Sequence, residues 1–294
     1  MAGRRLAPNP AGAHFLRDRR LITRLADASG ARPGQLVFDL GAGSGAITAA
    51  LTATGARVVA VERDPRLVTR LRRRFDCEPQ VRVVEADLRT IPLPRRDFLV
   101  VASLPFSLTR AVLGRLLGDP GVPLAGAELI VQLEAARQLA NPRPRDAETA
   151  WWTARYQIRI AQVISPGSFT PPPRVEAAWL SIRARPVPAS RAGQRRLRTI
   201  LPVAYRRPGT RTDKVLAGHR RLLIRAGLDP AAPVAAVTAS QWHQLAVLLG
   251  GGTTPARYRW PGAAPHTPAG LMSYYSADIP ERSGSHARTH LGAD

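Results

Sequence analysis

The stretch Val37-Phe-Asp-Leu-Gly-Ala-Gly-Ser-Gly45 decides the fold of this 294-residue chain. An apolar run over 36–40 precedes three glycines, and the helical spacing of Ile47 and Leu51 follows them. This order predicts a strand, a tight turn and a helix, which open an α/β nucleotide fold. Glycine lets the backbone turn and approach a ligand closely, and the helix amino end then offers it unpaired N–H groups. A glycine-rich turn without a ligand is one alternative, and a dehydrogenase, which carries a similar loop, is another.

Apolar runs and helical patterns alternate along the chain after this motif. Strands alternating with helices indicate a parallel sheet with right-handed crossovers. Besides 36–40, we predict strands over 57–61, 81–85, 98–102 and 128–133, further strands over about 156–164 and 177–183, and helices over about 46–54, 65–75 and 109–117. The runs 58–61 and 99–102 are apolar on both faces, as in buried parallel strands.

Composition divides the chain into four parts. We expect a basic Pro/Gly/Arg arm over 1–13, an α/β domain over 14–185, a helical domain over 186–250 and a disordered tail over 251–294. The α/β domain begins with helical spacing at 14–16 and 21–25. The helical domain holds three helical patterns, clearest at 216–228 and 241–249.

The chain is strongly basic, with 43 Lys and Arg against 21 Asp and Glu and a formal net charge of +22. Release of counterions from phosphates favours the binding of clustered cations, so this charge indicates a nucleic-acid partner. Lys214 is the single lysine. Codon bias of a GC-rich genome explains arginine in place of lysine, but not the excess of bases over acids. A membrane surface and simple solubility are the alternatives.

Cysteine and histidine usage gives no sign of a metal site. Cys77 is the single cysteine and the six histidines are scattered, so we expect neither a disulfide framework nor a metal. The start of the chain has no apolar signal region, and no run is long enough to cross a bilayer. We therefore expect a cytoplasmic, soluble protein with no membrane partner.

Acidic residues stand at the ends of two successive predicted strands. Glu62 follows the second strand about twenty residues after the glycine loop, where a carboxylate accepts hydrogen bonds from ribose hydroxyls. Asp87 follows the third strand at the same edge of the sheet. Solvated strand-end carboxylates are the alternative. Together, in an acid-poor chain, they favour a ligand with a ribose and an amino-bearing ring.

The fourth strand ends in Ser103-Leu104-Pro105-Phe106, which resembles the (Asn/Asp/Ser)-x-Pro-(Tyr/Phe) motif of amino-group methyltransferases. An exocyclic amine on an aromatic ring is a poor nucleophile because its lone pair is delocalised. A hydroxyl oxygen and a backbone carbonyl held in place by proline can accept hydrogen bonds from both N–H groups and draw the nitrogen toward sp³ geometry. The aromatic ring stacks on a base taken out of its stack. A strand-end turn with a core Phe106 is the alternative.

The pattern over about residues 12–250 resembles the rRNA adenine N6-methyltransferase family, which includes Erm-type enzymes and small-subunit adenine dimethylases. Two further blocks carry the resemblance. Gly12-Ala-His-Phe-Leu16 stands where the family favours Gln-Asn-Phe-Leu, and Ser168-Phe-Thr-Pro-Pro-Pro-Arg-Val-Glu-Ala-Ala178 is close to Phe-x-Pro-x-Pro-x-Val-(Asp/Glu)-(Ser/Ala). The second block separates this family from dehydrogenases, and a rigid Pro-rich linker is its alternative.

The resemblance implies a Rossmann-like S-adenosylmethionine-dependent methyltransferase domain over 14–185, with RNA-binding helices over 186–250. It implies that S-adenosylmethionine is held by His14, Leu16, Gly41, Gly43, Glu62, Asp87 and Ser103. It implies that the target adenine is held by the catalytic set Ser103, Leu104, Pro105 and Phe106. The arginine-rich composition, the prolines and the long tail are similar to Erm-type enzymes of high-GC actinobacteria. We therefore expect a monomer that methylates 23S rRNA, protein-free or in a partly assembled large subunit, and confers macrolide–lincosamide–streptogramin B resistance.

Two positions depart from the family pattern. Ser103 stands where Asn is usual, and its shorter hydroxyl is expected to slow turnover or the second methyl transfer. His14 also replaces an Asn, which is expected to alter its contact with the cofactor. A small-subunit rRNA adenine dimethylase, a non-catalytic RNA- or DNA-binding descendant of the fold, and a small-molecule methyltransferase remain open.

Overall fold

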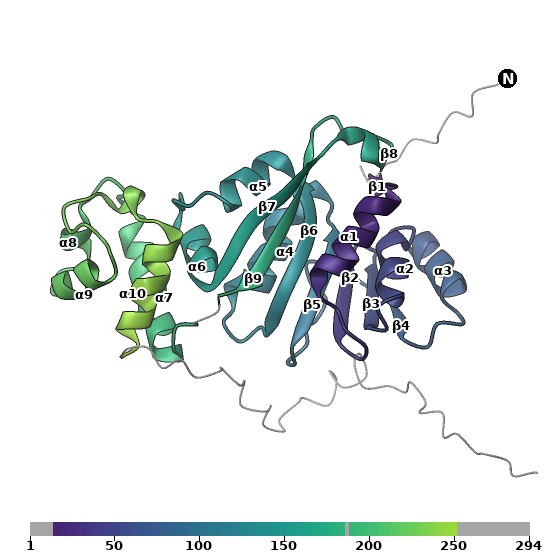
Figure 1. The fold of residues 1–294 in the computed structure, drawn as a ribbon, viewed down its shortest axis with the longest axis horizontal. Coiled ribbons are helices and arrows are strands. Elements are labelled where there is room, and N and C mark those ends of the chain that lie inside the picture. Colours follow the sequence, from purple (N-terminus) through teal and green to yellow (C-terminus); the bar gives the residue numbers. More distant parts are fainter. Residues whose placement is uncertain (1–13, 186–187, 252–294) are drawn as a thin grey trace, which may run out of the picture. The chain divides into compact units, whose positions relative to one another are not determined.

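The computed structural model describes residues 14–185 and 188–251, which contain a seven-stranded sheet with the order β4-β3-β2-β5-β6-β9-β7 (Figure 1). The first five strands in this order, from β4 to β6, are parallel to one another, and β9 is antiparallel to both of its neighbours. The strands are β2 (Leu36–Leu40), β3 (Arg57–Glu62), β4 (Val81–Glu85), β5 (Phe98–Ser103), β6 (Leu124–Gln132), β7 (Tyr156–Ile164) and β9 (Ala177–Ala184). The predicted α/β, Rossmann-like class is confirmed.

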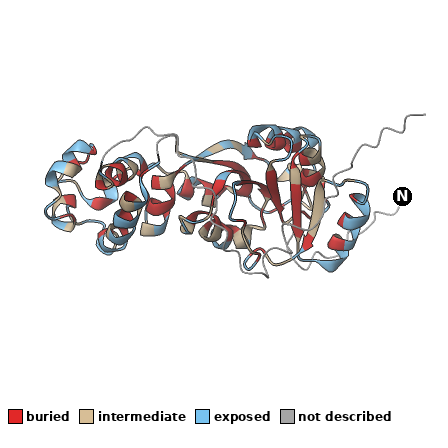
Figure 2. Cartoon of the chain, turned by 90° about the horizontal axis from the view of Figure 1, so that it is seen from below, coloured by how far each residue is buried: buried red, intermediate tan, exposed pale blue. Residues whose placement is uncertain are grey.

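Helices cover the sheet and turn their buried faces toward it (Figure 2). They are α1 (Arg19–Ser29), α2 (Ala46–Thr52), α3 (Pro65–Arg74), α4 (Thr109–Gly118), α5 (Leu133–Leu139) and α6 (Ala147–Arg155). Asp18, Asp64 and Asp146 precede α1, α3 and α6, and each carboxylate accepts a backbone N–H of the first turn. This capping satisfies donors that have no partner within the helix.

The predicted strands over 36–40, 81–85 and 156–164 have the observed bounds, and β6 begins earlier than predicted, at Leu124. The small residues at the start of β6 have low strand propensity, but Gly126 pairs with Arg183 of β9. The predicted helical spacing at 14–16 is wrong. Residues Phe15–Leu16 form β1, which pairs antiparallel with β8 (Phe169–Thr170), a partner too distant in sequence for local periodicity to reveal.

The later residues fold into the helices α7 (Arg191–Ala204), α8 (Thr212–Val215), α9 (Arg220–Arg225) and α10 (Ala239–Leu249). The helix predicted over 216–228 is shorter than predicted and is confined to α9, because Gly218 and Gly227 adopt φ angles of 81° and 73° on either side of it. Trp242 of α10 is fully buried, and its indole N–H donates to the Tyr205 hydroxyl at 3.1 Å. Three 3₁₀ turns complete the described chain, η1 (Phe106–Leu108), η2 (Pro166–Ser168) and η3 (Val234–Ala236).

The predicted arm over 1–13 and the predicted tail from residue 252 onward lie outside the described residues. Among the residues that are described, no helix has the length and apolar character needed to span a bilayer.

Gly193 lies where α7 packs on α10. A Cβ atom at this position would stand 2.0 Å from the Ala246 carbonyl oxygen, a backbone atom that cannot rotate away. We predict that Gly193→Ala lowers the free energy of unfolding by about 1–3 kcal/mol, the usual effect of overpacking, in a urea titration. Gly209→Ala is the control, because a Cβ there meets nothing within 4 Å. Equal stability of the two variants would contradict this packing.

Candidate active site

The sheet order reverses at β2, which lies between β3 and β5. In open parallel sheets, ligands bind outside the carboxyl ends of the strands at such a reversal. The glycine loop 41–45 leaves β2 at this point, and Ser103 ends β5. The topology therefore brings the glycine loop and the Ser103 motif to one edge of the sheet.

A cavity of about 40 Å³ lies at this edge. Five residues predicted from the sequence line it, namely His14, Leu16, Gly41, Gly43 and Ser103. The remaining lining residues are Phe15, Asp39, Ala42, Ser44, Ala46 and Ile47. The enclosed space is smaller than a nucleoside, so a nucleoside-sized ligand would also occupy the open edge of the sheet beside it.

The glycine loop is held in a backbone conformation that L-residues rarely adopt. Gly41, Gly43 and Gly45 have φ angles of 82°, 55° and 79°. The N–H groups of Gly41 and Ala42 donate to the Val61 carbonyl at 2.8 and 2.9 Å. A Cβ on Gly43 would lie 2.9 Å from the Phe15 ring. Glycine is therefore required both by the turn and by the close approach of β1.

Glu62 ties the loop to the end of β3. One carboxylate oxygen accepts the Gly43 N–H at 2.9 Å, and the other accepts the N–H groups of Arg63 and Asp64 at 2.8 and 3.0 Å. Each carboxylate oxygen can accept two hydrogen bonds. One acceptor position on the oxygen facing the loop is therefore left for a ligand hydroxyl.

Asp87 lies near this edge but does not line the cavity. Its loop is joined to β3 by the Ala86 N–H, which donates to the Glu62 carbonyl at 3.0 Å. The Asp87 carboxylate accepts from the Arg89 guanidinium, with the closest contact at 2.6 Å. This hydrogen bonding lowers the pKa of Asp87 to about 2. A ligand would have to share Asp87 with Arg89, a partner that the sequence analysis missed.

The Ser103 motif is fixed by the neighbouring strand. The Leu104 N–H donates to the Ile130 carbonyl of β6 at 3.0 Å, and the Leu104 side chain is buried. Pro105 then turns the chain into η1, which Phe106 begins. A Cβ on Gly41 would be 3.6 Å from the Pro105 ring, so the motif borders the glycine loop directly.

Phe106 and His14 lie together beside the motif. Their ring centroids are 6.2 Å apart at an interplanar angle of 33°. The His14 Nδ1–H donates to the Pro171 carbonyl at 2.7 Å. Phe106 is half-buried, so part of its ring is available to a ligand.

Asp39 is a site feature that the sequence analysis did not single out, although an acid inside an apolar strand is a visible signal. The Thr48 hydroxyl donates to its Oδ2 at 2.6 Å, and its buried Oδ1 has no partner among the described residues. Burial raises the pKa of Asp39 to about 7, against the lowering effect of the Thr48 bonds. Asp39 thus offers the cavity a carboxyl group that titrates near neutrality.

Comparison with known proteins gives one consistent result. The family model for ribosomal RNA adenine dimethylase matches residues 9–249. An rRNA adenine N-6-methyltransferase from Bacillus licheniformis is 26% identical over 89% of this chain and 93% of its own length. A ribosomal RNA small subunit methyltransferase A from Synechococcus sp. (strain RCC307) is 32% identical over 81% and 94%. The crystal structure of the 23S rRNA methyltransferase ErmE superposes with a TM-score of 0.69 at 30% identity, over 80% of this chain and 99% of that one.

The raised pKa of Asp39 makes stability depend on pH. Between about pH 4 and pH 7 the folded protein keeps a proton that the unfolded chain has released, so stability falls as pH rises. We predict that the unfolding free energy of the wild type, minus that of Asp39→Asn, falls by up to about 1.4 kcal/mol per pH unit as pH rises through this range. Above pH 7 it levels off. Urea titrations at several pH values measure it, and a pH-independent difference would contradict the assignment.

Proposed function

The chain belongs to the ribosomal RNA adenine dimethylase family of S-adenosylmethionine-dependent rRNA methyltransferases, and on that premise we propose that it methylates N6 of an adenine in 23S rRNA. The observation that carries the proposal is the meeting of the glycine loop and the Ser103 motif at one sheet edge. A methyl donor and an acceptor amine must lie side by side for transfer, and this edge provides for both.

Two observations fit S-adenosylmethionine to the edge. The loop at Gly43 leaves no space for a Cβ, and the buried Asp39 Oδ1 at the cavity has no partner among the described residues. When bound, the cofactor supplies an electrophilic methyl group. We propose that it is held by His14, Leu16, Gly41, Gly43, Glu62, Asp87 and Ser103.

The protein's own part in the reaction is to position the amine. We propose that Ser103 Oγ and the Leu104 carbonyl accept hydrogen bonds from the adenine amine. The bond from the Leu104 N–H to Ile130 holds that peptide segment in place, and Pro105 follows it. Phe106 would stack on the base. Because these groups are placed before the reaction, they stabilise the transition state without rearranging.

The preference for 23S over 16S rRNA rests on likeness to ErmE and on the arginine-rich composition. If it is correct, the outcome is macrolide–lincosamide–streptogramin B resistance. Small-subunit methyltransferases are also among the relatives, so 16S rRNA is the second candidate. We further propose a cytoplasmic monomer without a metal, in which residues 14–185 carry the chemistry and residues 186–250 bind RNA.

The proposed cofactor contacts predict two binding defects. Glu62→Ala should weaken S-adenosylmethionine binding by about 1.5–3 kcal/mol, the usual effect of losing a hydrogen bond to a charged group, and Asp87→Ala should weaken it as well. Isothermal titration measures this, with thermal unfolding to show that the variants are folded. Glu85→Ala is the matched control, because Glu85 is an exposed carboxylate at the end of the adjacent strand. Unchanged affinity in both variants would remove Glu62 and Asp87 from the site.

The proposed amine site predicts a series of rate effects. Ser103→Ala should lower the methyl-transfer rate much more than cofactor affinity, because the hydroxyl matters most as the amine changes geometry. Ser103→Asn should keep or raise the rate, since it provides a longer acceptor. Phe106→Ala should lower the rate of RNA methylation, because about 1–3 kcal/mol of stacking on the base is lost. Phe106→Tyr should be tolerated, since it keeps the ring.

Single-turnover transfer of labelled methyl to a domain V fragment of 23S rRNA measures these rates, with mono- and dimethyladenosine resolved. Wild-type transfer with the expected order of variants supports the proposal. If the wild type modifies no rRNA and Ser103→Asn restores no activity, the chain is a non-catalytic RNA-binding member of the family.

A further inference from the structure

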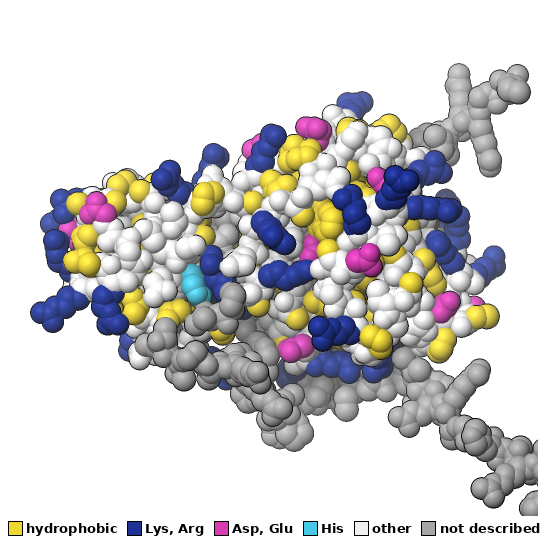
Figure 3. All heavy atoms as spheres, in the orientation of Figure 1, with side chains coloured by type: hydrophobic (Ala, Val, Ile, Leu, Met, Phe, Trp, Pro, Cys, Tyr) yellow, Lys and Arg dark blue, Asp and Glu magenta, His cyan; other side chains and the backbone are white. Residues whose placement is uncertain are grey.

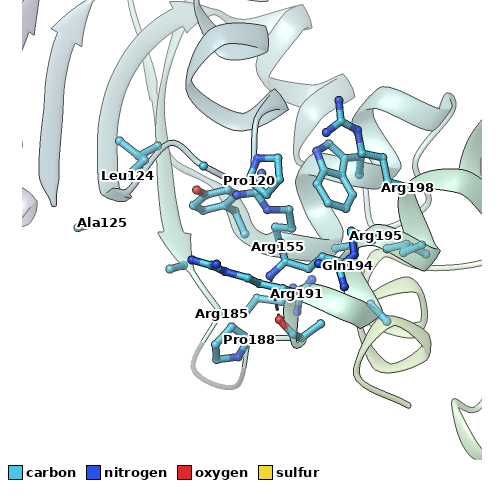
Figure 4. Close-up of a pocket in the computed structure, with 18 of the residues that line it drawn as sticks. Pro120, Leu124, Ala125, Arg155, Arg185, Pro188, Arg191, Gln194, Arg195 and Arg198 are labelled. Atoms are coloured by element: carbon cyan, nitrogen blue, oxygen red, sulfur yellow. Dashed lines mark hydrogen bonds between the residues drawn. The ribbon is translucent and has the colours of Figure 1, made fainter. Parts of the chain in front are cut away.

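A second cavity, of about 830 Å³, opens at the sheet edge opposite the glycine loop (Figure 4). Leu124 and Tyr156 begin β6 and β7 here, and Ala184 ends the antiparallel β9. This is therefore the edge from which the parallel strands start. The first turns of α7 form another wall of the cavity.

Five of the nineteen residues that line the cavity are arginines, and Figure 4 labels them: Arg155, Arg185, Arg191, Arg195 and Arg198. The three on α7 are spaced by four and three residues, so they lie on one face of that helix. All three are exposed. A helix face thus presents three guanidinium groups toward the cavity.

Two of the arginines are held in place by backbone carbonyls, and one of them also lies over an aromatic ring. Arg155 donates to the Leu117 carbonyl at 2.6 Å, and its guanidinium carbon lies 5.0 Å from the Trp151 ring centroid. Arg185 donates twice to the Thr153 carbonyl, at 3.0 and 2.8 Å. A guanidinium has five N–H donors, so these bonds leave others for a ligand.

The cluster has little countercharge. Within residues 14–185 and 188–251, none of the five arginines forms an ion pair, and Asp97 is the one acidic residue that lines the cavity. Burial lowers the pKa of Arg155 against the raising effect of Tyr156 and Asp119, and the charge of Arg198 lowers it further. Figure 3 shows basic side chains over much of one face of the molecule. The five arginines described above line a single cavity, where an anion would relieve their repulsion.

We propose that this cavity binds the phosphodiester backbone of the substrate RNA at a point away from the target adenine. Planar guanidinium groups match phosphate oxygens with paired hydrogen bonds. The volume exceeds that of one phosphate, and exposed apolar residues such as Ala125 and Pro188 can contact the adjoining sugar. The identity of the RNA rests on the proposed function, whereas the binding of a phosphate chain does not.

The test compares RNA affinities of the full chain by fluorescence anisotropy at several salt concentrations. The test variant is Arg191→Gln/Arg195→Gln/Arg198→Gln, whose side chains are exposed and whose replacements keep the helix. The RNAs are a domain V fragment and nested truncations of it. We expect the triple variant to bind the longest RNA about tenfold more weakly, with a salt slope smaller by about two to three. The triple variant should bind S-adenosylmethionine as tightly as the wild type does. It should also bind, with unchanged affinity, the shortest RNA to which the wild type still binds.

Arg195→Gln and Arg196→Gln form the matched pair. Both remove one charge from the same helix, but Arg196 donates to the Leu249 carbonyl and does not line the cavity. We expect the first to weaken binding of the long RNA more than the second. Equal effects of the pair, equal losses for all RNA lengths, or no loss in the triple variant would overturn the proposal.

Adenosine monophosphate distinguishes RNA from a free nucleotide. If the nucleotide binds the wild type and not the triple variant, while RNA affinity is the same in both, the cavity is a nucleotide site and the proposal is wrong. Methyl transfer is scored separately. A wild type that methylates no rRNA but shows the length-dependent loss would overturn the proposed function and support this one. If the wild type methylates rRNA and the triple variant binds every RNA as tightly as the wild type, the proposed function is supported and the phosphate-binding proposal is overturned.

Discussion

The site depends on the hydrogen bonds that hold the glycine loop against the end of β3. Val61 and Glu62 together accept the N–H groups of Gly41, Ala42 and Gly43. These bonds hold the glycines at positive φ, which only glycine adopts without strain. Gly41 is thereby placed beside Pro105, and Gly43 against the ring of Phe15. The glycine loop, the Ser103 motif and β1 therefore meet at one edge of the sheet.

Much of the parallel sheet could be predicted from the sequence, because buried parallel strands are continuous apolar runs with local signals. Interactions between distant segments could not. The pairing of β1 with β8 and the early start of β6 depend on partners far along the chain, and α5 and α6 were not predicted. At the site, the motifs and the resemblance they carry predicted five of the eleven residues that line the cavity. The sequence did not show that Arg89 binds Asp87 or that burial raises the pKa of Asp39. The roles of the site residues stay predictions.

Net charge was visible in the composition, but its placement required the structure. The ion pairs among the described residues use Arg89, Arg110, Arg183, Arg211 and Arg220. The five arginines around the cavity at the opposite edge form no such ion pairs among the described residues; they donate to backbone carbonyls or are exposed. Chemistry at one sheet edge and phosphate binding at the other would let the protein read a folded RNA at two separated points. Phosphate contacts of this kind fix orientation, whereas specificity for the base comes from the site itself.

The central claim is that the sheet edge at Ser103 methylates adenine in 23S rRNA. Competition between equal amounts of protein-free 23S and 16S rRNA for labelled methyl from S-adenosylmethionine tests it most directly, with the modified nucleoside identified by mass spectrometry. The account predicts N6-methyladenosine or N6-dimethyladenosine at a single position of 23S rRNA. Label confined to 16S rRNA would contradict the proposed substrate, and label in neither RNA would contradict the proposed catalysis.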